Sequence, residues 1–431
     1  MDDGLAERVA RAVAGLHGMI STLFDRLRAD SLDEPGVSRD PYGPGEQLAH
    51  QTVIAVARDI GLDVDVDFVG NAFLTLPGRN RSAPRVIVGS HLDTVPHGGN
   101  FDGAAGVLAG LAAAAGLQAL GLVPECDLTI MAIRAEESVW FGVSYIGSRG
   151  ALGTLPDGAL VAVRRDTGRT LADHVRDCGG DPAAMAAGQR SLEPENIRAY
   201  LEVHIEQAPS LAEAGRAVGI CTGIPGTFRY PDAWIEGQTD HVGTPRRFRR
   251  DAAMAGAEFA MELDALWEAR EAAGIPMACT LGRFHTDVEH HGMTIVPGTF
   301  FFSLDVRAYD AEVLAKLERE VENIIAGIEQ RRGVRFHLGI RASAAIGRVD
   351  PAIVAGLERE AAALNLPVLH LGSPASHDGA AFAAAGVAMA MLFVRNTNGS
   401  HNPREAMEVD DLLAACQVLI LWLARNICKE T

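Results

Sequence analysis

Strand-like and helix-like segments alternate along the first half of the chain, and this alternation constrains the fold more than any other feature. Apolar runs at 86–89 and 128–133 have the length and composition of buried strands, and the stretch 103–123 between them suits a helix. Alternation of this kind predicts an α/β domain with a largely parallel or mixed sheet. Ligands and substrates of such sheets gather at the carboxyl ends of the strands, so we expect the functional residues there.

A different order of segments begins near residue 218. Strands and helices follow one another as β-α-β-β-α-β, which is the ferredoxin-like pattern, with strands expected at 230–237, 277–284, 299–306 and 334–338 and helices at 251–273 and 311–330. The α/β pattern then resumes with a helix at 351–364, a strand at 387–394 and a helix at 410–427. We therefore expect a discontinuous catalytic domain, 1–216 and 339–431, that carries an inserted domain, 217–338.

Charge and cysteine content exclude several classes of partner. The formal net charge of the 431 residues is −18, which argues against binding to nucleic acid or to an anionic membrane. The six cysteines are scattered without a C-x-x-C pair, as expected for a protein of the reducing cytoplasm.

No signal peptide is visible at the N-terminus. The apolar stretch 103–123 consists largely of alanine and glycine, so we expect a helix packed on a sheet rather than a membrane span.

Side chains that can bind a metal lie at or beyond the ends of four predicted strands, at 86–89, 128–133, 200–205 and 387–394. They are His91 and Asp102, the pair Glu136 and Glu137, His204, and His401. A single histidine after a strand is more often an ordinary buried or surface residue than a ligand. Here, however, the strand ends would converge on one rim of a sheet. Imidazole and carboxylate groups are ligands for zinc and for manganese, cobalt or nickel, so we predict two divalent metal ions, with zinc as the first expectation.

Asp93 and one of the two neighbouring glutamates have expected roles other than binding a metal. Asp93 is placed to accept the second N–H of a metal-binding His91, although capping a turn is the simpler alternative. Of the neighbours Glu136 and Glu137, a two-metal hydrolase would use one as a ligand and the other to move the proton of the attacking water.

Several motifs in the same order carry a resemblance to a known family. They are GSHLDTVPHGGNFDG at 89–103, EES at 136–138, FGVSYIGSRG at 141–150, EVHIEQ at 202–207 and GSHNPRE at 399–405. The chain resembles the dinuclear-zinc aminoacylase/carboxypeptidase superfamily, and within it the hydantoinase/carbamoylase branch of N-carbamoyl-L-amino acid hydrolases, β-ureidopropionases and allantoate amidohydrolases. The resemblance implies that His91 and His204 hold one ion and that Glu137 and His401 hold the other. It also implies that Asp102 bridges the ions and that Glu136 is the general base and acid.

The resemblance extends to the inserted domain and to the substrate pocket. The segment DHVGTP at 240–245 is similar to a motif of the branch, which implies a homodimer formed through the inserted domain. It also implies that His241 stabilises the oxyanion in the partner's active site. Arg307 matches an arginine that binds a substrate carboxylate, and Gln207 and His377 match positions that line the pocket.

The chain departs from the branch in the expected pocket. His291 and Thr294 occupy positions where the branch usually has asparagine. We therefore expect a small-molecule substrate with a carboxylate and a linear amide or ureido bond, resembling an N-carbamoyl amino acid but with a flatter or bulkier group beside Phe228, His290 and His291. An allantoate-type or N-acyl-amino-acid amidohydrolase is the nearest alternative, and a dipeptidase fits less well. A metal-binding protein without catalysis is the alternative from another class, and Glu136 argues against it.

Overall fold

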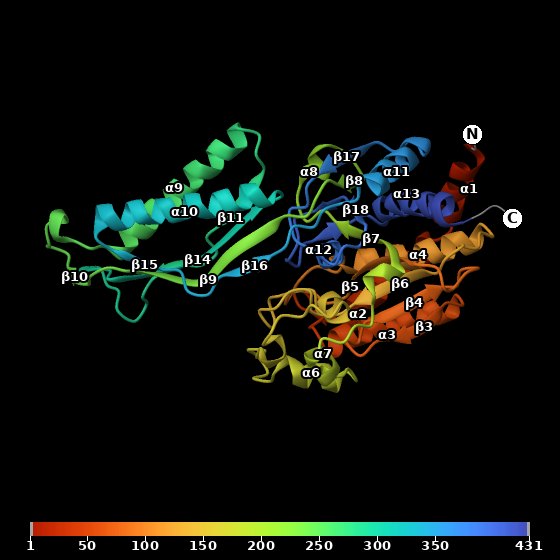
Figure 1. Ribbon diagram of the computed structural model, residues 1–431, viewed down its shortest axis with the longest axis horizontal. Coiled ribbons are helices and arrows are strands. Elements are labelled where there is room, and N and C mark those ends of the chain that lie inside the picture. Colours follow the sequence, from red (N-terminus) through yellow and green to blue (C-terminus); the bar gives the residue numbers. More distant parts are fainter. Residues whose placement is uncertain (1–2, 429–431) are drawn as a thin grey trace. The chain divides into compact units, whose positions relative to one another are not determined.

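The computed structural model describes residues 3–428 and forms two compact units (Figure 1). The larger unit combines residues up to Ile224 with those from Gly347 onward, and the inserted unit runs from Pro225 to Ile346. Among the described residues no helix is long and apolar enough to cross a membrane. The expected limits of the insert, 217 and 338, differ from this division. Strand β8 (Val218–Cys221) pairs within the large sheet, whereas β16 (Ala342–Ala344) pairs with a strand of the insert.

The larger unit is built on a sheet of eight strands with both parallel and antiparallel neighbours. Their order is β17 (Val368–Leu371), β8, β18 (Met389–Val394), β7 (Ile197–Ile205), β5 (Arg85–His91), β6 (Leu128–Ile133), β4 (Ala72–Leu76) and β3 (Asp63–Val66). The four central strands β18, β7, β5 and β6 run parallel to one another, so their carboxyl ends lie along one edge. The mixed-sheet α/β fold predicted from the sequence is confirmed.

Helices cover both faces of this sheet. On one face lie α1 (Asp3–Ala14), α2 (His17–Asp30), α3 (Pro44–Asp59), α4 (Ala104–Ala119), α11 (Pro351–Ala363) and α13 (Val409–Ile427), which share the largest apolar core with the strands. A second apolar core on the same sheet includes residues of α5 (Ile146–Ala151), α8 (Ser210–Glu213) and α12 (Asp378–Ala384). The large unit is therefore an α/β fold with helices on each side of the sheet.

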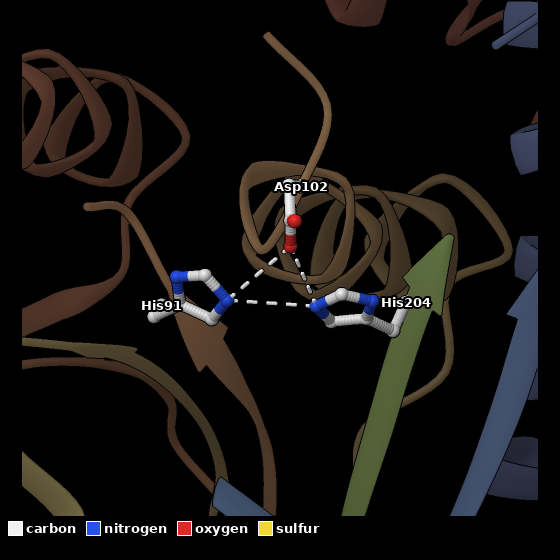
Figure 2. A group of neighbouring side chains, drawn as sticks. All are labelled: His91, Asp102 and His204. Carbon is white, nitrogen blue, oxygen red and sulfur yellow. Dashed lines mark hydrogen bonds and ion pairs between the residues drawn. The ribbon is translucent and has the colours of Figure 1, made fainter. Parts of the chain in front are cut away.

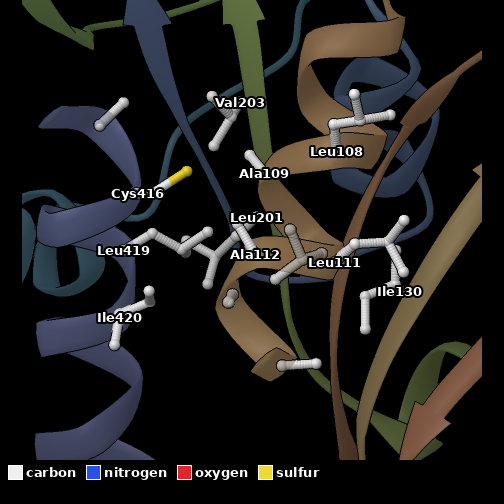
Figure 3. Close-up of a cluster of buried hydrophobic side chains, with 14 of the residues drawn as sticks. Leu108, Ala109, Leu111, Ala112, Ile130, Leu201, Val203, Cys416, Leu419 and Ile420 are labelled. Atoms are coloured by element: carbon white, nitrogen blue, oxygen red, sulfur yellow. The ribbon is translucent and has the colours of Figure 1, made fainter. Parts of the chain in front are cut away.

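Helix α4 packs unusually closely between the sheet and α13 (Figure 3). Leu108 and Leu111 of α4 contact the same apolar cluster as Ile130 and Val203 of the strands. Gly106 explains the close approach, because a Cβ atom at this position would lie 2.1 Å from the carbonyl oxygen of Val203. The glycine- and alanine-rich stretch that precedes residue 123 is thus a buried helix, as its composition predicted.

Short elements complete the larger unit. They are β1 (Leu32–Asp33), β2 (Gly36–Val37), α6 (Leu171–Asp177), α7 (Pro182–Ala186), β19 (Asn396–Thr397), β20 (Ala406–Met407) and the 3-10 turns η1 (Ala159–Val161) and η2 (Pro194–Asn196). Helix α6 begins with a capping box, in which Thr170 and Asp173 each accept a hydrogen bond from the other's backbone amide.

The inserted unit has the ferredoxin-like β-α-β-β-α-β order that the sequence predicted. Its antiparallel sheet follows the order β11 (Met277–Thr280), β14 (Thr299–Ala308), β9 (Gly226–Glu236), β15 (Arg335–His337), with β12 (Phe284–Thr286) and β16 at its margins. Burial alternates along β14, so one face of the sheet packs against α9 (Ala252–Ala272) and α10 (Ala311–Arg332). A separate ribbon pairs β10 (Asp240–His241) with β13 (Ile295–Val296), and η3 (Arg246–Phe248) follows β10.

Candidate active site

The predicted metal ligands of the larger unit lie at the carboxyl edge of its parallel strands. His91 is the last residue of β5 and His204 lies near the end of β7, while Glu136 and Glu137 follow β6. Asp102 precedes α4, and His401 lies in the loop between β19 and β20. Because adjacent parallel strands end at the same edge, residues far apart in the sequence are brought together here.

His91, Asp102 and His204 form a first group of ligand-type atoms (Figure 2). The Nε2 atoms of the two histidines lie 3.5 Å apart, and Asp102 Oδ1 is 3.6 Å from that of His91 and 3.1 Å from that of His204. Each imidazole has its Nδ1 beside a backbone carbonyl oxygen, of Asp93 at 3.1 Å and of Ile205 at 2.9 Å. Donation of the Nδ1 hydrogen to these oxygens leaves the Nε2 lone pairs facing one another, which suits a cation between them.

Asp102, Glu137 and His401 form a second group beside the first. His401 Nε2 lies 3.3 Å from Asp102 Oδ2 and 3.2 Å from Glu137 Oε1. Asp102 thus directs one oxygen at each group. Its buried Oδ1 has no hydrogen-bond partner among the described residues, as expected of an atom that binds a metal. The donor set therefore fits two cations that share one carboxylate.

Electrostatics at this edge favour positive charge. Burial lowers the pKa of the His401 imidazole, but the Asp102 and Glu137 carboxylates outweigh it and raise that pKa to about 11. Burial raises the pKa of the Asp102 carboxyl, yet contacts with His204, His401 and His91 hold it well below its usual range. The carboxylates therefore attract positive charge to this edge, which metal cations would supply while displacing protons from the imidazoles.

Glu136 is buried beside these groups without being part of either. Burial is the main reason that the pKa of its carboxyl lies well above the usual value. The neighbouring Glu137 carboxylate adds to the rise, and the His91 imidazole opposes it. A carboxyl group with a raised pKa beside a metal site is suited to accept and return a proton.

Asp93 connects the first histidine to both glutamates. Its Oδ1 lies 3.3 Å from His91 Nδ1, but the hydrogen bond of that nitrogen is with the Asp93 backbone carbonyl oxygen rather than with the carboxylate that the sequence predicted as acceptor. Its carboxylate also accepts the backbone N–H groups of Glu136 and Glu137, each at 3.0 Å, and no sequence pattern indicated these two contacts. One residue thereby orients an imidazole and the backbone of the two glutamates.

Two predicted substrate residues of the larger unit lie against the metal-ligand groups. Gln207 donates from Nε2 to Asp102 Oδ2 at 2.8 Å, with His401 Nε2 3.4 Å away. The His377 ring lies 4.3 Å from the His204 ring, and its Nε2 is 2.8 Å from Ser373 Oγ. Both side chains are therefore within reach of a molecule bound at the ligand groups.

The other predicted residues belong to the inserted unit. His241 is exposed on β10, and the backbone N–H of Val242 donates to the carbonyl oxygen of Thr294. His291 Nδ1 lies 2.8 Å from Thr286 Oγ1, and Arg307 donates to the Asp305 carboxylate. Phe228 requires a correction. It is 0% exposed in the apolar core of this unit, so it packs the fold and cannot line a pocket.

Sequence reasoning missed two residues that hold Asp102. Ser400 Oγ lies 2.7 Å from Asp102 Oδ2 and 2.6 Å from Glu405 Oε2, and its single hydrogen can be donated to either carboxylate. Glu405 Oε1 accepts the backbone N–H groups of Phe101 at 2.9 Å and Asp102 at 3.2 Å. Both residues lie in the motif GSHNPRE, so their place beside His401 was an available signal.

The fold and the two ligand groups define a class of protein, the metal-dependent α/β hydrolases with an inserted ferredoxin-like unit. Comparison with known proteins makes this specific, because the pattern of Peptidase family M20/M25/M40 matches residues 87–425. The chain belongs to this family, as the motifs implied.

Similar proteins narrow the class of reaction. The chain is 34% identical over 386 residues to an N-carbamoyl-L-amino acid amidohydrolase of Geobacillus stearothermophilus, covering 89% of this chain and 92% of the relative. It is 30% identical to the allantoate amidohydrolase of Escherichia coli (strain K12), covering 90% and 92%. A solved hydantoinase/carbamoylase family amidase from Burkholderia ambifaria superposes with a TM-score of 0.81 at 29% identity, covering 96% and 98%. The chain is thus a hydrolase of carbon–nitrogen bonds, and these similar members of its family are amidohydrolases.

Proposed function

We propose that this enzyme hydrolyses the ureido bond of a substrate resembling an N-carbamoyl amino acid, with two divalent ions, in the first instance zinc, at the edge of the large sheet. The observation that carries the proposal is the Asp102 carboxylate, whose Oδ1 lies beside His91 and His204 while its Oδ2 lies beside His401. The sequence similarity to amidohydrolases supports a ureido or amide carbonyl as the reacting group.

The proposed chemistry divides between the ions and Glu136. Ions held by His91 and His204 and by Glu137 and His401, with Asp102 shared, would supply a water of lowered pKa. The buried Glu136 carboxylate accepts a proton from the attacking water and then delivers it to the departing nitrogen. For a carbamoyl substrate the products are an amino acid, carbon dioxide and ammonia.

Arg307 is the proposed partner of the substrate carboxylate. Asp305 accepts hydrogen bonds from Arg307 Nε at 3.0 Å and from Arg229 Nε at 2.7 Å, so two guanidinium groups share one carboxylate. A substrate carboxylate would bind Arg307 with the paired geometry that arginine favours. Gln207 and His377 are proposed to contact the substrate nearer the ligand groups.

His241 is proposed to act in the active site of the partner subunit within a homodimer formed through the inserted unit. The backbone N–H of Gly243 donates to His241 Nδ1 at 3.1 Å, which leaves the hydrogen of a neutral ring on Nε2. An exposed Nε2–H is the donor that an oxyanion formed at the carbonyl carbon needs. We also expect a reducing cytoplasm as the place of action, because all six cysteines are free thiols.

The substrate pocket is proposed to differ from that of an ordinary carbamoylase at His291 and Thr294. Both are exposed in the loop before β13, where an imidazole and a hydroxyl stand in place of two amides. We therefore propose that the group beyond the ureido carbonyl is flatter or bulkier than the side chain of a common amino acid. Robust turnover of ordinary N-carbamoyl-L-amino acids would contradict this proposal about the pocket and leave the reaction class intact.

A substrate panel with metal analysis tests the function. The purified enzyme is assayed on N-carbamoyl-L-amino acids, N-acyl-L-amino acids and allantoate, before chelation, after it, and after the return of zinc, manganese, cobalt or nickel. We expect ureido substrates to be hydrolysed only with metal, and Glu136→Gln to lose about 10²–10⁴-fold in kcat while keeping its metal. A protein that binds metal but turns over none of the panel would support the non-catalytic alternative.

A further inference from the structure

The segment that carries the two active-site glutamates is held by side chains along its whole backbone. Residues 134–137 belong to no helix or strand, yet each of their four amide groups donates to a side chain distant in sequence. The acceptors are Asn71 for Arg134, Glu46 for Ala135, and Asp93 for both glutamates, at distances of 3.0, 2.8, 3.0 and 3.0 Å. A loop fixed at every amide positions its side chains with the precision of a strand.

Glu46 is the least expected of these acceptors. It lies in the first turn of α3 and is 0% exposed. Its Oε1 accepts the N–H of Ala135, while its Oε2 accepts the backbone N–H of Tyr42 at 2.6 Å and Nη1 of Arg134 at 2.9 Å. Arg134 is fixed in turn by the carbonyl oxygen of Gly70 at 3.0 Å. The buried carboxylate is thus neutralised and fully hydrogen-bonded, as a buried charge must be.

Ala135 shows why such a brace is needed. Its φ of 53° lies in the left-handed region, which disfavours any residue with a side chain. The left-handed residue breaks the alternation of an extended chain, in which Glu136 and Glu137 would point to opposite sides of the sheet. The hydrogen bond from the Ala135 amide to Glu46 acts directly on this strained residue.

We propose that Glu46 is a positioning residue for the reaction: its carboxylate holds the left-handed turn at Ala135 and thereby sets the direction of Glu136. The proposal rests on the proposed role of Glu136 as the base. It adds a residue of α3, outside the metal-ligand groups, to those that determine the rate.

Kinetics of Glu46→Gln test the proposal. A misplacement of the base by about 1 Å can cost on the order of 10²-fold, so we expect kcat to fall roughly 10- to 100-fold with KM within about twofold of wild type. In this background Ala135→Gly should recover much of the lost kcat, because glycine adopts positive φ without strain. Glu360→Gln is the matched control. Glu360 is also a buried carboxylate paired with an arginine, Arg425, but it lies on α11, so this variant should lower stability without lowering kcat.

Hydrogen exchange separates this proposal from the proposed function. Glu46→Gln should speed exchange of the amides at 134–137 whether or not a substrate is known, whereas an inactive wild type would contradict the function alone. Unchanged kcat and exchange in Glu46→Gln, or a loss of kcat that Ala135→Gly does not relieve, would overturn the positioning role. If Glu46→Gln fails to fold, Glu46→Asp keeps the charge beside Arg134 and withdraws the acceptor from Ala135, so the same two readouts apply.

Discussion

At the scale of the residue, Asp102 is where the two ligand groups meet. One oxygen lies beside each group, and Ser400 and Glu405 fix the orientation of the carboxylate and its backbone. Asp102→Ala should therefore lose both ions, since it removes a ligand from each. His401→Ala should lose only one, because His401 contacts one group and is 50% exposed at its margin. Metal counts by plasma mass spectrometry after dialysis measure the difference. Equal losses in the two variants would contradict a shared carboxylate.

Local sequence predicted which residues would lie together at the edge of the sheet but not what holds them. His91, Asp102, Glu136, Glu137 and His204 stand at the ends of apolar runs or beside glycines, so their place at a strand edge follows from the pattern. The acceptor for the Ala135 amide, Glu46, lies 89 positions away on a helix whose polar residues resemble any exposed face. Such a contact depends on how α3 packs on the sheet, and no short-range pattern specifies that packing. The prediction that Phe228 lines the pocket was wrong for the same reason. A residue on a strand can lie on either face of the sheet, and the local sequence does not specify which.

At the scale of the element, helix α4 lies so close to the sheet that its packing can be tested by a single substitution. Alanine favours a helix over glycine by about 1 kcal/mol. At Gly106, however, a Cβ atom would lie 2.1 Å from the Val203 carbonyl oxygen and 2.6 Å from Ser90 Cβ. Overpacking should outweigh propensity, so Gly106→Ala should destabilise the fold by about 1–3 kcal/mol. Gly18 in α2 has nothing within 4 Å of the added Cβ, so Gly18→Ala should be neutral or stabilising. Denaturant unfolding compares the two, and an equal effect would contradict the packing argument.

The free energy of unfolding should depend on pH through His50, which lies on helix α3. Burial, with Arg134 nearby, holds the pKa of this imidazole well below 6.5. The unfolded chain takes up a proton below 6.5 that the folded chain refuses, so stability is complete above pH 6.5 and falls as the pH drops toward the folded pKa. The slope attributable to one such group is about 1.4 kcal/mol per pH unit. Between pH 6.5 and 5, replacement of His50 by leucine should reduce the slope of the unfolding free energy against pH by this amount. If the curves of unfolding free energy against pH are parallel for the wild type and the variant, another group is responsible for the pH dependence.

Periodicity and apolar runs predicted most of the long elements, but not the helices α1 and α2, and left the short elements unassigned. The strands at 128–133 and 299–306 and the helix at 311–330 were found because burial on one or both faces imposes a regular pattern. The region 146–196 contains helices of five to seven residues, such as α6 and α7, which are too short for a period to emerge. Caps were the available signal there, since Thr170 and Asp181 both accept from backbone amides at helix starts.

At the scale of the whole molecule, the proposed homodimer divides one active site between two chains. Glu136 belongs to the larger unit of one chain, and the His241 that serves it would come from the other. Glu136→Gln and His241→Ala should each be nearly inactive alone. A mixed dimer, however, contains one site with an intact Glu136 and an intact His241. The arrangement therefore predicts that two inactive proteins produce activity on mixing.

Subunit exchange measures this complementation. After the two variants are unfolded together and refolded at equal concentration, about a quarter of wild-type activity should return, because half of the dimers are mixed and each has one complete site. Refolding each variant alone is the control, and sedimentation confirms that dimers re-form. A chain that carries both substitutions should stay inactive when it is refolded alone. If His241 serves its own subunit, the mixture stays as inactive as its components, since every site then lacks either the base or the oxyanion donor.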